Sequence, residues 1–199
     1  MVLIGPNHIG AGGAPVSTSD RGWATPFGRV EADTGAVRAL AAAGVATVAP
    51  AAIAYEHAVA GLMPALAAQL PGVRVVPLAV SGLGLADARR LAGALAPLAA
   101  TPGTAVVASV DFSHYLRPEE ARLRNGETLA VLRSLDAPAV IRLGNDHLDS
   151  PGSIAVLMET MRRVGATAFD LRADTSSAEL AGRGPGGTTS YISGFYRPA

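Results

Sequence analysis

Three of the four histidines of this chain lie beside apolar runs, in segments where a polar ring is hard to explain by packing alone. His8 lies in GPNHIG, His57 in YEHAV and His114 in SVDFSHYL. Imidazole is the commonest metal ligand and acid–base group near neutral pH. If folding brings these rings together at the ends of strands, they would form a polar site that binds a metal ion or moves protons.

The composition excludes several other kinds of chemistry. All 16 basic residues are arginine, so no lysine can form a Schiff base, act as a general base or complete a P-loop. The chain has no cysteine, which excludes disulfides, thiolate ligands and thiol nucleophiles. The GRGPGG run lacks the ending of a phosphate loop, and no G-x-S-x-G elbow is present. Nucleotide binding and serine hydrolysis are therefore disfavoured.

Charge and length set the physical context. The 16 basic and 16 acidic residues cancel and form no run of like charge, so we expect neither nucleic acid nor an anionic membrane surface as a partner. A chain of 199 residues with 49% hydrophobic residues is long enough for one domain with a full core. The start MVLIGPNH lacks the basic flank and length of a signal peptide, and no apolar run reaches the roughly 18 residues of a membrane span. We expect a cytoplasmic location.

The pattern of apolar residues predicts strands that alternate with helices. Strands are predicted at 2–5, 28–32, 74–80, 105–109, 168–173 and 189–196, and helices at 34–43, 56–70 and 86–99, after Pro118, and at 151–164. Thr34 is the predicted cap of the first helix and Ser150 of the last, and GRGPGG is a predicted flexible segment before the final strand. This order is typical of a single α/β domain whose mostly parallel or mixed central sheet is flanked by helices on both faces.

Such sheets bind their ligands beyond the carboxyl ends of the strands. His8 lies in the loop after the first predicted strand, and Asp111 and His114 come directly after the strand at 105–109. We therefore expect these side chains to gather at one edge of the sheet.

Six segments taken together resemble the Memo family in order and spacing, over nearly the whole chain. They are GPNHIG, WATPFG with a following Asp33, EHAV with Pro64, SVDFSHYL, LDSPGSIAVLM and GGTTSYISGFY. The family is also known as AmmeMemoRadiSam system protein B and is similar to the LigB-like catalytic subunit of class III extradiol dioxygenases, non-haem iron enzymes that open catechol rings. The resemblance implies an α/β fold of the LigB/Memo-like kind with a single metal-sized pocket.

The resemblance also implies roles for particular residues. His8 matches the ligand histidine of the family's G-P-x-H motif, and Asp149 falls where animal Memo proteins have a metal-binding Cys and the dioxygenases a carboxylate. Asp111 and His114 match a D-F-x-H pair whose histidine acts as an acid or base in the dioxygenases. His57 matches the histidine of an E-H-S motif, with alanine in place of the usual serine. We predict His8, Asp149 and His57 as metal ligands, and His114, Asp111 and His57 as catalytic residues.

One departure from the family pattern bears on the metal. The family normally begins with an upstream strand and a P-H-A-G-Y motif whose His is the other imidazole ligand, so residues 1–199 are expected to form a single Memo-like domain that lacks this segment. Two histidines and a carboxylate make the facial triad that holds Fe(II). His8 and Asp149 supply two ligands, and the third would be His57, His114 or Asp111, or the site is broken. A late assigned start and a natural short form are competing explanations.

Two functions follow from the resemblance. The first is a metal-dependent oxidoreductase, dioxygenase-like and with Fe(II), that acts on a small-molecule substrate. A zinc or manganese ion would instead activate water for hydrolysis. The second is a non-catalytic Memo-like binding module with a degenerate site and no metal, which would act with AMMECR-like and radical SAM protein partners.

Each of these residues also has a purely structural interpretation. His8 could hydrogen-bond the backbone of its glycine-rich loop, and His57 could simply stand at a helix start. Asp111 could form an Asx-turn and Asp149 could cap the helix that follows it. His147 is predicted to be a surface residue, although it is the nearest substitute ligand in the sequence.

Overall fold

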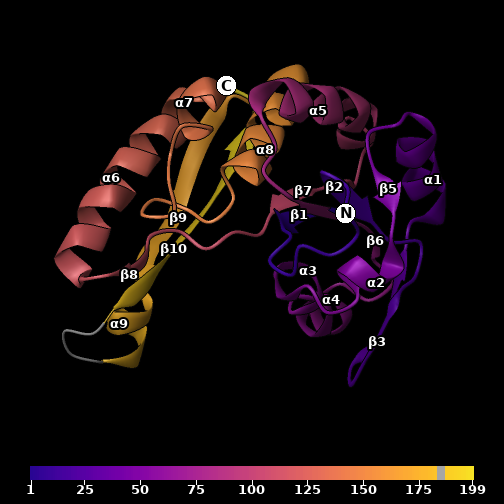
Figure 1. Cartoon of the computed structure of the whole chain (residues 1–199), viewed down its shortest axis with the longest axis horizontal. Coiled ribbons are helices and arrows are strands. Elements are labelled where there is room, and N and C mark those ends of the chain that lie inside the picture. Colours follow the sequence, from indigo (N-terminus) through magenta and orange to yellow (C-terminus); the bar gives the residue numbers. More distant parts are fainter. Residues whose placement is uncertain (183–186) are drawn as a thin grey trace.

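The structure is a computed structural model that describes residues 1–182 and 187–199. Its strands form a seven-stranded mixed sheet in the N-terminal half and a three-stranded antiparallel sheet in the C-terminal half (Figure 1). The first sheet contains β1 (Val2–Pro6), β2 (Val16–Thr18), β3 (Trp23–Thr25), β4 (Gly28–Ala32), β5 (Thr47–Val48), β6 (Arg74–Val80) and β7 (Val106–Ala108). The second contains β8 (His114–Leu116), β9 (Ala168–Ser176) and β10 (Thr188–Arg197).

The central strands of the larger sheet are parallel, as predicted. Its order is β3-β4-β6-β1-β7, and β1 pairs in parallel with both β6 and β7. The short strand β2 pairs antiparallel with β6 and parallel with β5, and β3 pairs antiparallel with β4. The sheet is therefore mixed but mostly parallel. β1 is buried at every position, as expected for a strand covered on both faces.

Helices cover both faces of this sheet. The helices are α1 (Thr34–Ala42), α2 (Pro50–Ile53), α3 (His57–Ala60), α4 (Met63–Gln69), α5 (Leu85–Ala99), α6 (Pro118–Ser134), α7 (Ala137–Val140), α8 (Pro151–Arg163) and α9 (Ser177–Ala181). Ile4 of β1 packs in a core with α1, α5 and α8, whereas its neighbour Leu3 packs on the other face with α2, α3 and α4. This alternation follows from the two-residue period of a strand.

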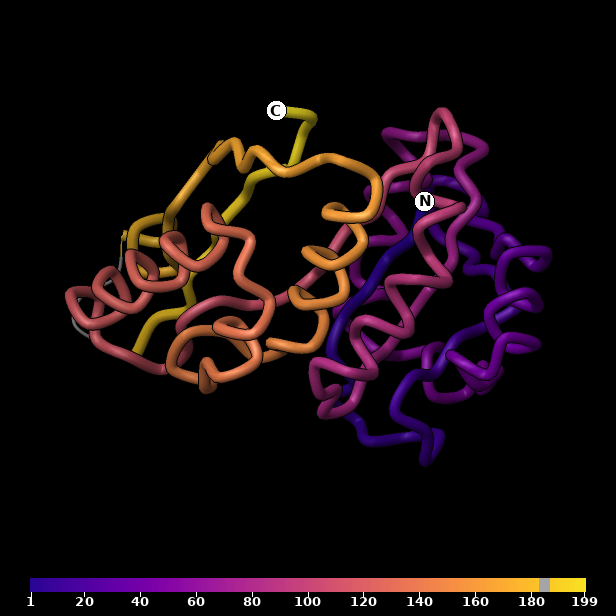
Figure 2. Tube along the Cα trace, turned by 90° about the horizontal axis from the view of Figure 1, so that it is seen from above, coloured from indigo at the N-terminus to yellow at the C-terminus, as the bar shows by residue number. Residues whose placement is uncertain are grey.

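The C-terminal strands form a separate layer with α6. β9 and β10 pair over most of their length, and the hydroxyl of Tyr196 donates to the carbonyl of Leu132 in α6 at 2.8 Å. A tube view along the chain shows α8 (orange) between this layer and the central sheet (Figure 2). Within the part of the chain that the structure describes, no helix combines the length and apolar character needed to cross a membrane.

Several local predictions change in the structure. Asp33, not Thr34, caps α1, because its side chain accepts the N–H of Ala36 at 3.1 Å while Thr34 is already helical. The helix predicted over 56–70 is two helices, since Pro64 has no N–H to continue the first one. Ser150 caps α8, as predicted. The predicted flexible segment at 182–187 lies largely outside the described residues.

Candidate metal centre

The ends of neighbouring parallel strands bring the candidate residues together. His8 lies in the loop after β1, and Asp111 follows β7, which pairs with β1 in parallel. His57 is the first residue of α3, His114 begins β8, and Asp149 directly precedes the capping residue of α8. The carboxyl edge of the sheet therefore gathers residues that are up to 141 positions apart in the chain.

Asp149 is held in the centre of this group. Its Oδ2 atom lies 3.2 Å from Nε2 of His8, and its Oδ1 atom accepts the backbone N–H of Asp111 at 3.2 Å. The backbone N–H of Asp149 in turn donates to the carbonyl of Asp111 at 3.0 Å. These bonds join the segment before α8 to the segment after β7, so the carboxylate has a defined position.

His114 and Asp111 complete one group of metal-ligand type. One ligand atom from each of Asp111, His114 and Asp149 lies within 4.8 Å of the others, a spacing that a single metal ion could bridge. Nε2 of His114 is 3.6 Å from Oδ2 of Asp111, and the His114 side chain is 13% exposed. The Nδ1 atom of His114 is buried and has no hydrogen-bond partner in the part of the chain that the structure describes.

Glu56 is a buried carboxylate that fixes the ring of His8. It is fully buried, and it accepts the backbone N–H of His8 at 2.7 Å while its Oε1 atom lies 2.7 Å from Nδ1 of His8. Burial would raise the pKa of Glu56, but the hydrogen bonds from His8 and from the backbone of Ala58 outweigh burial and lower it. With Nδ1 bonded to Glu56, the Nε2 atom of His8 is the nitrogen left to bind a metal.

His57 lies on the other side of His8. The two rings stack with centroids 4.2 Å apart and an angle of 23° between their planes. Nδ1 of His57 is 3.5 Å from Oε1 of Glu56, and the His57 side chain is 68% exposed. His8, Glu56 and His57 form a second group whose ligand atoms lie within 4.8 Å of one another.

The electrostatic balance at this site favours a cation. Burial raises the pKa of the Asp149 carboxyl, and the nearby Asp111 carboxylate raises it further, against the opposing effect of His8 and His114. Burial would lower the pKa of His8, but Glu56 and Asp149 outweigh burial and raise it. The site thus contains a carboxylate whose charge is poorly solvated, beside imidazole nitrogens that can bind a metal ion.

A cavity opens beside this group. Its volume is about 640 Å³, and His8 and Asp149 line it together with residues of the 81–84 loop and the start of α8. A cavity of this size accommodates a small molecule. Its walls bring His8 and Asp149, two of the three predicted ligands, to the edge of a space that a substrate could occupy, whereas His57 does not line it.

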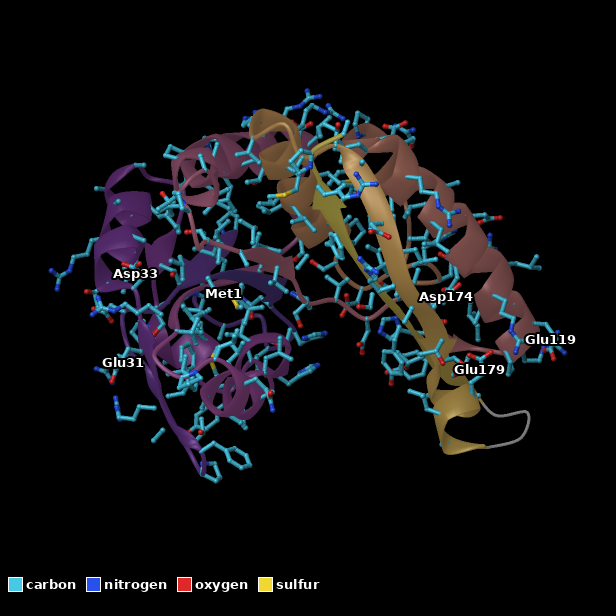
Figure 3. The ribbon with its side chains drawn as sticks, turned by 180° about the vertical axis from the view of Figure 1, so that it is seen from behind. Met1, Glu31, Asp33, Glu119, Asp174 and Glu179 are labelled. Atoms are coloured by element: carbon cyan, nitrogen blue, oxygen red, sulfur yellow. The ribbon has the colours of Figure 1, made fainter. Side chains whose placement is uncertain are left out.

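Acidic side chains of the C-terminal elements make ordinary hydrogen bonds and ion pairs. Glu119, Asp174 and Glu179 belong to α6, β9 and α9, away from the sheet that carries Met1 (Figure 3). Arg122 pairs with Glu179 at 2.7 Å, and the amide of Asn125 donates to Asp174 at 2.7 Å. Asp174 and Glu179 therefore have partners, and among the described residues no imidazole forms an ion pair with either of them.

The structure changes two of the structural interpretations. His147, predicted at the surface, is only 8% exposed, because Glu127 and Asp146 approach its two ring nitrogens at 2.7 and 3.0 Å. Asp149 does not cap α8, since that role belongs to Ser150. Sequence reasoning missed Glu56, for which the available signal was an acidic residue directly before His57.

The fold and this arrangement define an α/β protein with a site of histidine and carboxylate side chains of metal-binding type. The sequence profile of the family described as Memo-like protein matches residues 1–191. The chain belongs to the Memo-like family, as its motifs predicted.

Curated relatives carry the same family name. A MEMO1 family protein of Methanosarcina barkeri is 30% identical over 190 residues, which cover 91% of this chain and 70% of that protein. A MEMO1 family protein of Archaeoglobus fulgidus is 32% identical over 191 residues, or 92% and 71% of the two chains. One from Methanopyrus kandleri is 29% identical over 189 residues, or 92% and 67%.

Proposed function

We propose that this chain binds one divalent metal ion through His8, Asp149 and His114, and that with Fe(II) it is a dioxygenase-like oxidoreductase for a small oxygen-rich molecule. The observation that carries the proposal is the position of Asp149, 3.2 Å from Nε2 of His8 and grouped within 4.8 Å with His114 and Asp111. Two imidazoles and one carboxylate are the ligand set of non-haem Fe(II) oxygenases.

The residues present fit a metal ion. The accessible nitrogen of His114 faces Asp111, since its other nitrogen is buried, and Glu56 leaves only Nε2 of His8 for a ligand. A bound cation would neutralise the Asp149 carboxylate, whose pKa burial raises. The site offers imidazole and carboxylate but no thiolate, because the chain has no cysteine. This set suits iron, with manganese and zinc as alternatives.

Fe(II) held by His8, Asp149 and His114 would supply electrons for the reaction of O2 with a substrate. The chain's own residues would orient the metal ligands and handle protons. Glu56 accepts a hydrogen bond from Nδ1 of His8 and so fixes the ring, as carboxylates behind ligand histidines do in metal sites. The cavity beside His8 and Asp149 would receive the substrate.

Two residues can move protons at this site. The Asp111 side chain is 47% exposed and lies 3.6 Å from His114, so it can accept a proton from a substrate hydroxyl and return it to water. His57 stacks on His8 and is 68% exposed, which gives it contact with both the site and solvent. We propose Asp111, beside His114, as the base that accepts the substrate proton. His57 is the group that exchanges protons with solvent.

Metal content is the first test. The chain is prepared without oxygen and without chelators, and its metal is measured by plasma mass spectrometry beside His8→Ala and Asp149→Ala. We expect close to one iron per chain, lost in both variants. His147→Ala is the matched control, because His147 also lies between two carboxylates but outside the site.

Two further variants separate the candidate third ligands. His114→Ala should lose the metal, whereas His57→Ala should keep it if His57 only exchanges protons. The opposite result would replace His114 by His57 in the ligand set. Absence of metal from the unsubstituted chain after anaerobic loading with iron, manganese or zinc would overturn the metal proposal and favour the non-catalytic binding module.

Oxygen consumption tests the reaction. The iron-loaded chain is given a panel of catechols in an oxygen electrode, with His8→Ala as background. Uptake above that background supports the dioxygenase-like proposal. Full metal occupancy without uptake would leave a metal site with another chemistry, and a zinc or manganese form would then be assayed for hydrolysis.

A further inference from the structure

The two histidines of the proposed ligand set are held in different ways. Glu56 fixes the ring of His8, with Oε1 2.7 Å from Nδ1. No hydrogen bond fixes the ring of His114 among the described residues, since its Nδ1 atom is buried without a partner. Its Nε2 atom lies 3.6 Å from Oδ2 of Asp111, too far for a hydrogen bond. The position of His114 therefore depends on the backbone that carries it.

The backbone before His114 is bonded to β10. The N–H of Phe112 donates to the carbonyl of Ser190 at 3.1 Å, and the N–H of Ser190 donates to the carbonyl of Ser113 at 2.9 Å. The chain then turns, and Tyr115 has a φ of 56°. A residue with a Cβ atom keeps this left-handed conformation only where its surroundings hold it. The segment from Ser113 to Tyr115 therefore needs further support.

Two buried side chains connect this segment to α6. Ser113 is fully buried, and its hydroxyl donates to Oδ1 of Asn125 at 3.0 Å. Asn125 is 3% exposed, and its Nδ2 group donates to Oδ1 of Asp174 in β9 at 2.7 Å. The carbonyl of Ala121 is 3.5 Å from the Ser113 hydroxyl, beyond the usual O–H···O distance. Asn125 thus joins the segment that carries His114 to both α6 and β9 (Figure 1).

A side-chain amide fits both neighbours of Asn125 at once. It has an oxygen that accepts from a hydroxyl and an NH2 group that donates to a carboxylate. An unpaired Ser113 hydroxyl would be costly, because it is buried. We propose that Asn125 is a positioning residue of the metal site, which sets the place of His114 by holding Ser113. The inference rests on the proposed function only in giving His114 the role of a ligand.

The His114 ring itself supplies the first test. The imidazole nitrogens of the metal-free chain are observed by NMR, and the four histidines are assigned by single replacements with glutamine. In Asn125→Leu the His114 signals should shift or split into more than one set, because the released turn takes up other conformations. The His147 signals should stay unchanged. Glu127 of α6 lies 2.7 Å from Nε2 of His147, so they report whether α6 itself has moved.

Two smaller changes accompany this variant. Ser113→Ala removes only the hydroxyl, and it should also shift the His114 signals, which keeps the test open if Asn125→Leu does not fold. Thr128→Val is the matched control. Thr128 is also buried in α6, but its hydroxyl donates to the carbonyl of Arg124 in its own helix at 2.9 Å. This control should leave the His114 signals as they are.

An exchange of the two bonded side chains tests the bonds themselves. Asn125→Asp alone sets a second carboxylate against Asp174 and should disturb the His114 signals. The double variant Asn125→Asp/Asp174→Asn exchanges donor and acceptor between the two positions and keeps an oxygen for the Ser113 hydroxyl. It should restore the signals of the unsubstituted chain, whereas a residue that only fills space would show no such rescue.

Metal affinity is the second readout. Fe(II) affinity, measured by competition with a chelator, should fall roughly 10–100-fold in Asn125→Leu, as for other groups that orient a ligand. It should recover in the double variant and stay unchanged in Thr128→Val. Absence of metal from the unsubstituted chain would overturn the proposed function, and the ring signals of the metal-free chain would then decide alone whether Asn125 positions His114.

Three results would overturn the proposal. One is an unchanged set of His114 signals in Asn125→Leu and Ser113→Ala, with folding checked by melting curves. Another is an equal change at His114 and His147, which would show a general displacement of α6. The third is a double variant as disturbed as Asn125→Asp, because the shape of Asn125 and not its hydrogen bonds would then hold the segment.

Discussion

Nδ1 of His8 lies 2.7 Å from Oε1 of Glu56, and the same carboxylate accepts the backbone N–H of His8. Glu56 is fully buried and also caps α3 through the N–H of Ala58 at 3.2 Å. One side chain thus fixes the orientation of a candidate ligand and the start of a helix. The consequences for metal binding and for stability can be measured separately.

Glu56→Gln should weaken both metal binding and the stability of the fold. A glutamine keeps one acceptor oxygen but turns an NH2 group toward N–H donors, so one buried donor loses its partner. We expect the chain to lose about 1–3 kcal/mol of unfolding free energy. Metal affinity should fall roughly 10–100-fold, as for other carboxylates that hydrogen-bond a ligand histidine. Urea unfolding and competition with a fluorescent chelator measure the two effects.

The control for this variant is Glu120→Gln, at an exposed position in the first turn of α6. It removes the same charge from a carboxylate that forms no ion pair with an imidazole among the described residues, and it should change neither quantity appreciably. Unchanged metal affinity in Glu56→Gln would mean that Glu56 only supports the loop and helix around it.

Asp149→Asn should separate stability from metal binding. The pKa of Asp149 is raised because its carboxylate is buried and faces Asp111, so its charge costs free energy in the metal-free fold. Replacement by a neutral isostere relieves that cost. The metal-free variant should therefore be at least as stable as the unsubstituted chain, yet retain no metal. Thermal melting in a chelator and metal analysis check this, and a metal-free variant of clearly lower stability would contradict the argument.

The regular part of the fold could be predicted from apolar periodicity. The strand predicted at 74–80 matches β6 residue for residue, because six consecutive apolar residues after Arg74 leave a strong signal. β2, β3 and β5 have only two or three residues each and were missed. So few residues show no period, and these segments are strands only because β2 pairs with β6, β3 with β4 and β5 with β2.

Most residues of the candidate site could be predicted from the sequence, but their arrangement in space could not. Motif resemblance pointed to His8, Asp111, His114 and Asp149, which the structure brings together across as many as 141 positions. Glu56 could not be recognised in the same way. An acidic residue before a helix is usually a solvated cap, and only the fold reveals that this one is buried against His8. A contact between residues far apart in the chain, such as that of Glu56 with His8, leaves no signal in the local sequence.

Gly5→Ala should disturb the site by forcing β1 and α3 apart. A Cβ atom at Gly5 would lie 2.7 Å from the Cβ atom of Ala58 and 3.2 Å from the carbonyl oxygen of Ser109, so α3 would have to move away from β1. That movement displaces Glu56 and His57. We expect a loss of about 1–3 kcal/mol in unfolding free energy, as for other overpacked sites, together with weaker metal binding.

Gly93→Ala is the control for this variant. Nothing lies within 4 Å of a Cβ atom at Gly93, which stands inside α5. Alanine favours a helix interior over glycine by roughly 0.5–1 kcal/mol, so this variant should be slightly more stable. Similar effects of the two substitutions in urea unfolding would refute the close contact between β1 and α3.

Acid should weaken the contact between α5 and α8 through Glu159. This carboxylate is 3% exposed and accepts from Nε of Arg89 at 3.2 Å and from Nη1 of Arg163 at 2.9 Å. Burial would raise its pKa, but Arg163, Arg89 and Arg162 together outweigh burial and lower it below the ordinary value of 4.5. A lowered folded pKa means that the stabilisation is fully present above pH 4.5 and is lost as the pH falls through the folded value.

Glu159→Gln should consequently cost about 1–3 kcal/mol at pH 7, the range for a buried group that loses charged partners. The difference between the variant and the unsubstituted chain should shrink as the pH falls below 4.5. Urea unfolding from pH 7 to pH 3 measures that difference. Glu31→Gln breaks an exposed pair with Arg29 and should leave the unfolding free energy unchanged at every pH. A difference for Glu159→Gln that is independent of pH would show that its packing, and not its charge, holds the two helices together.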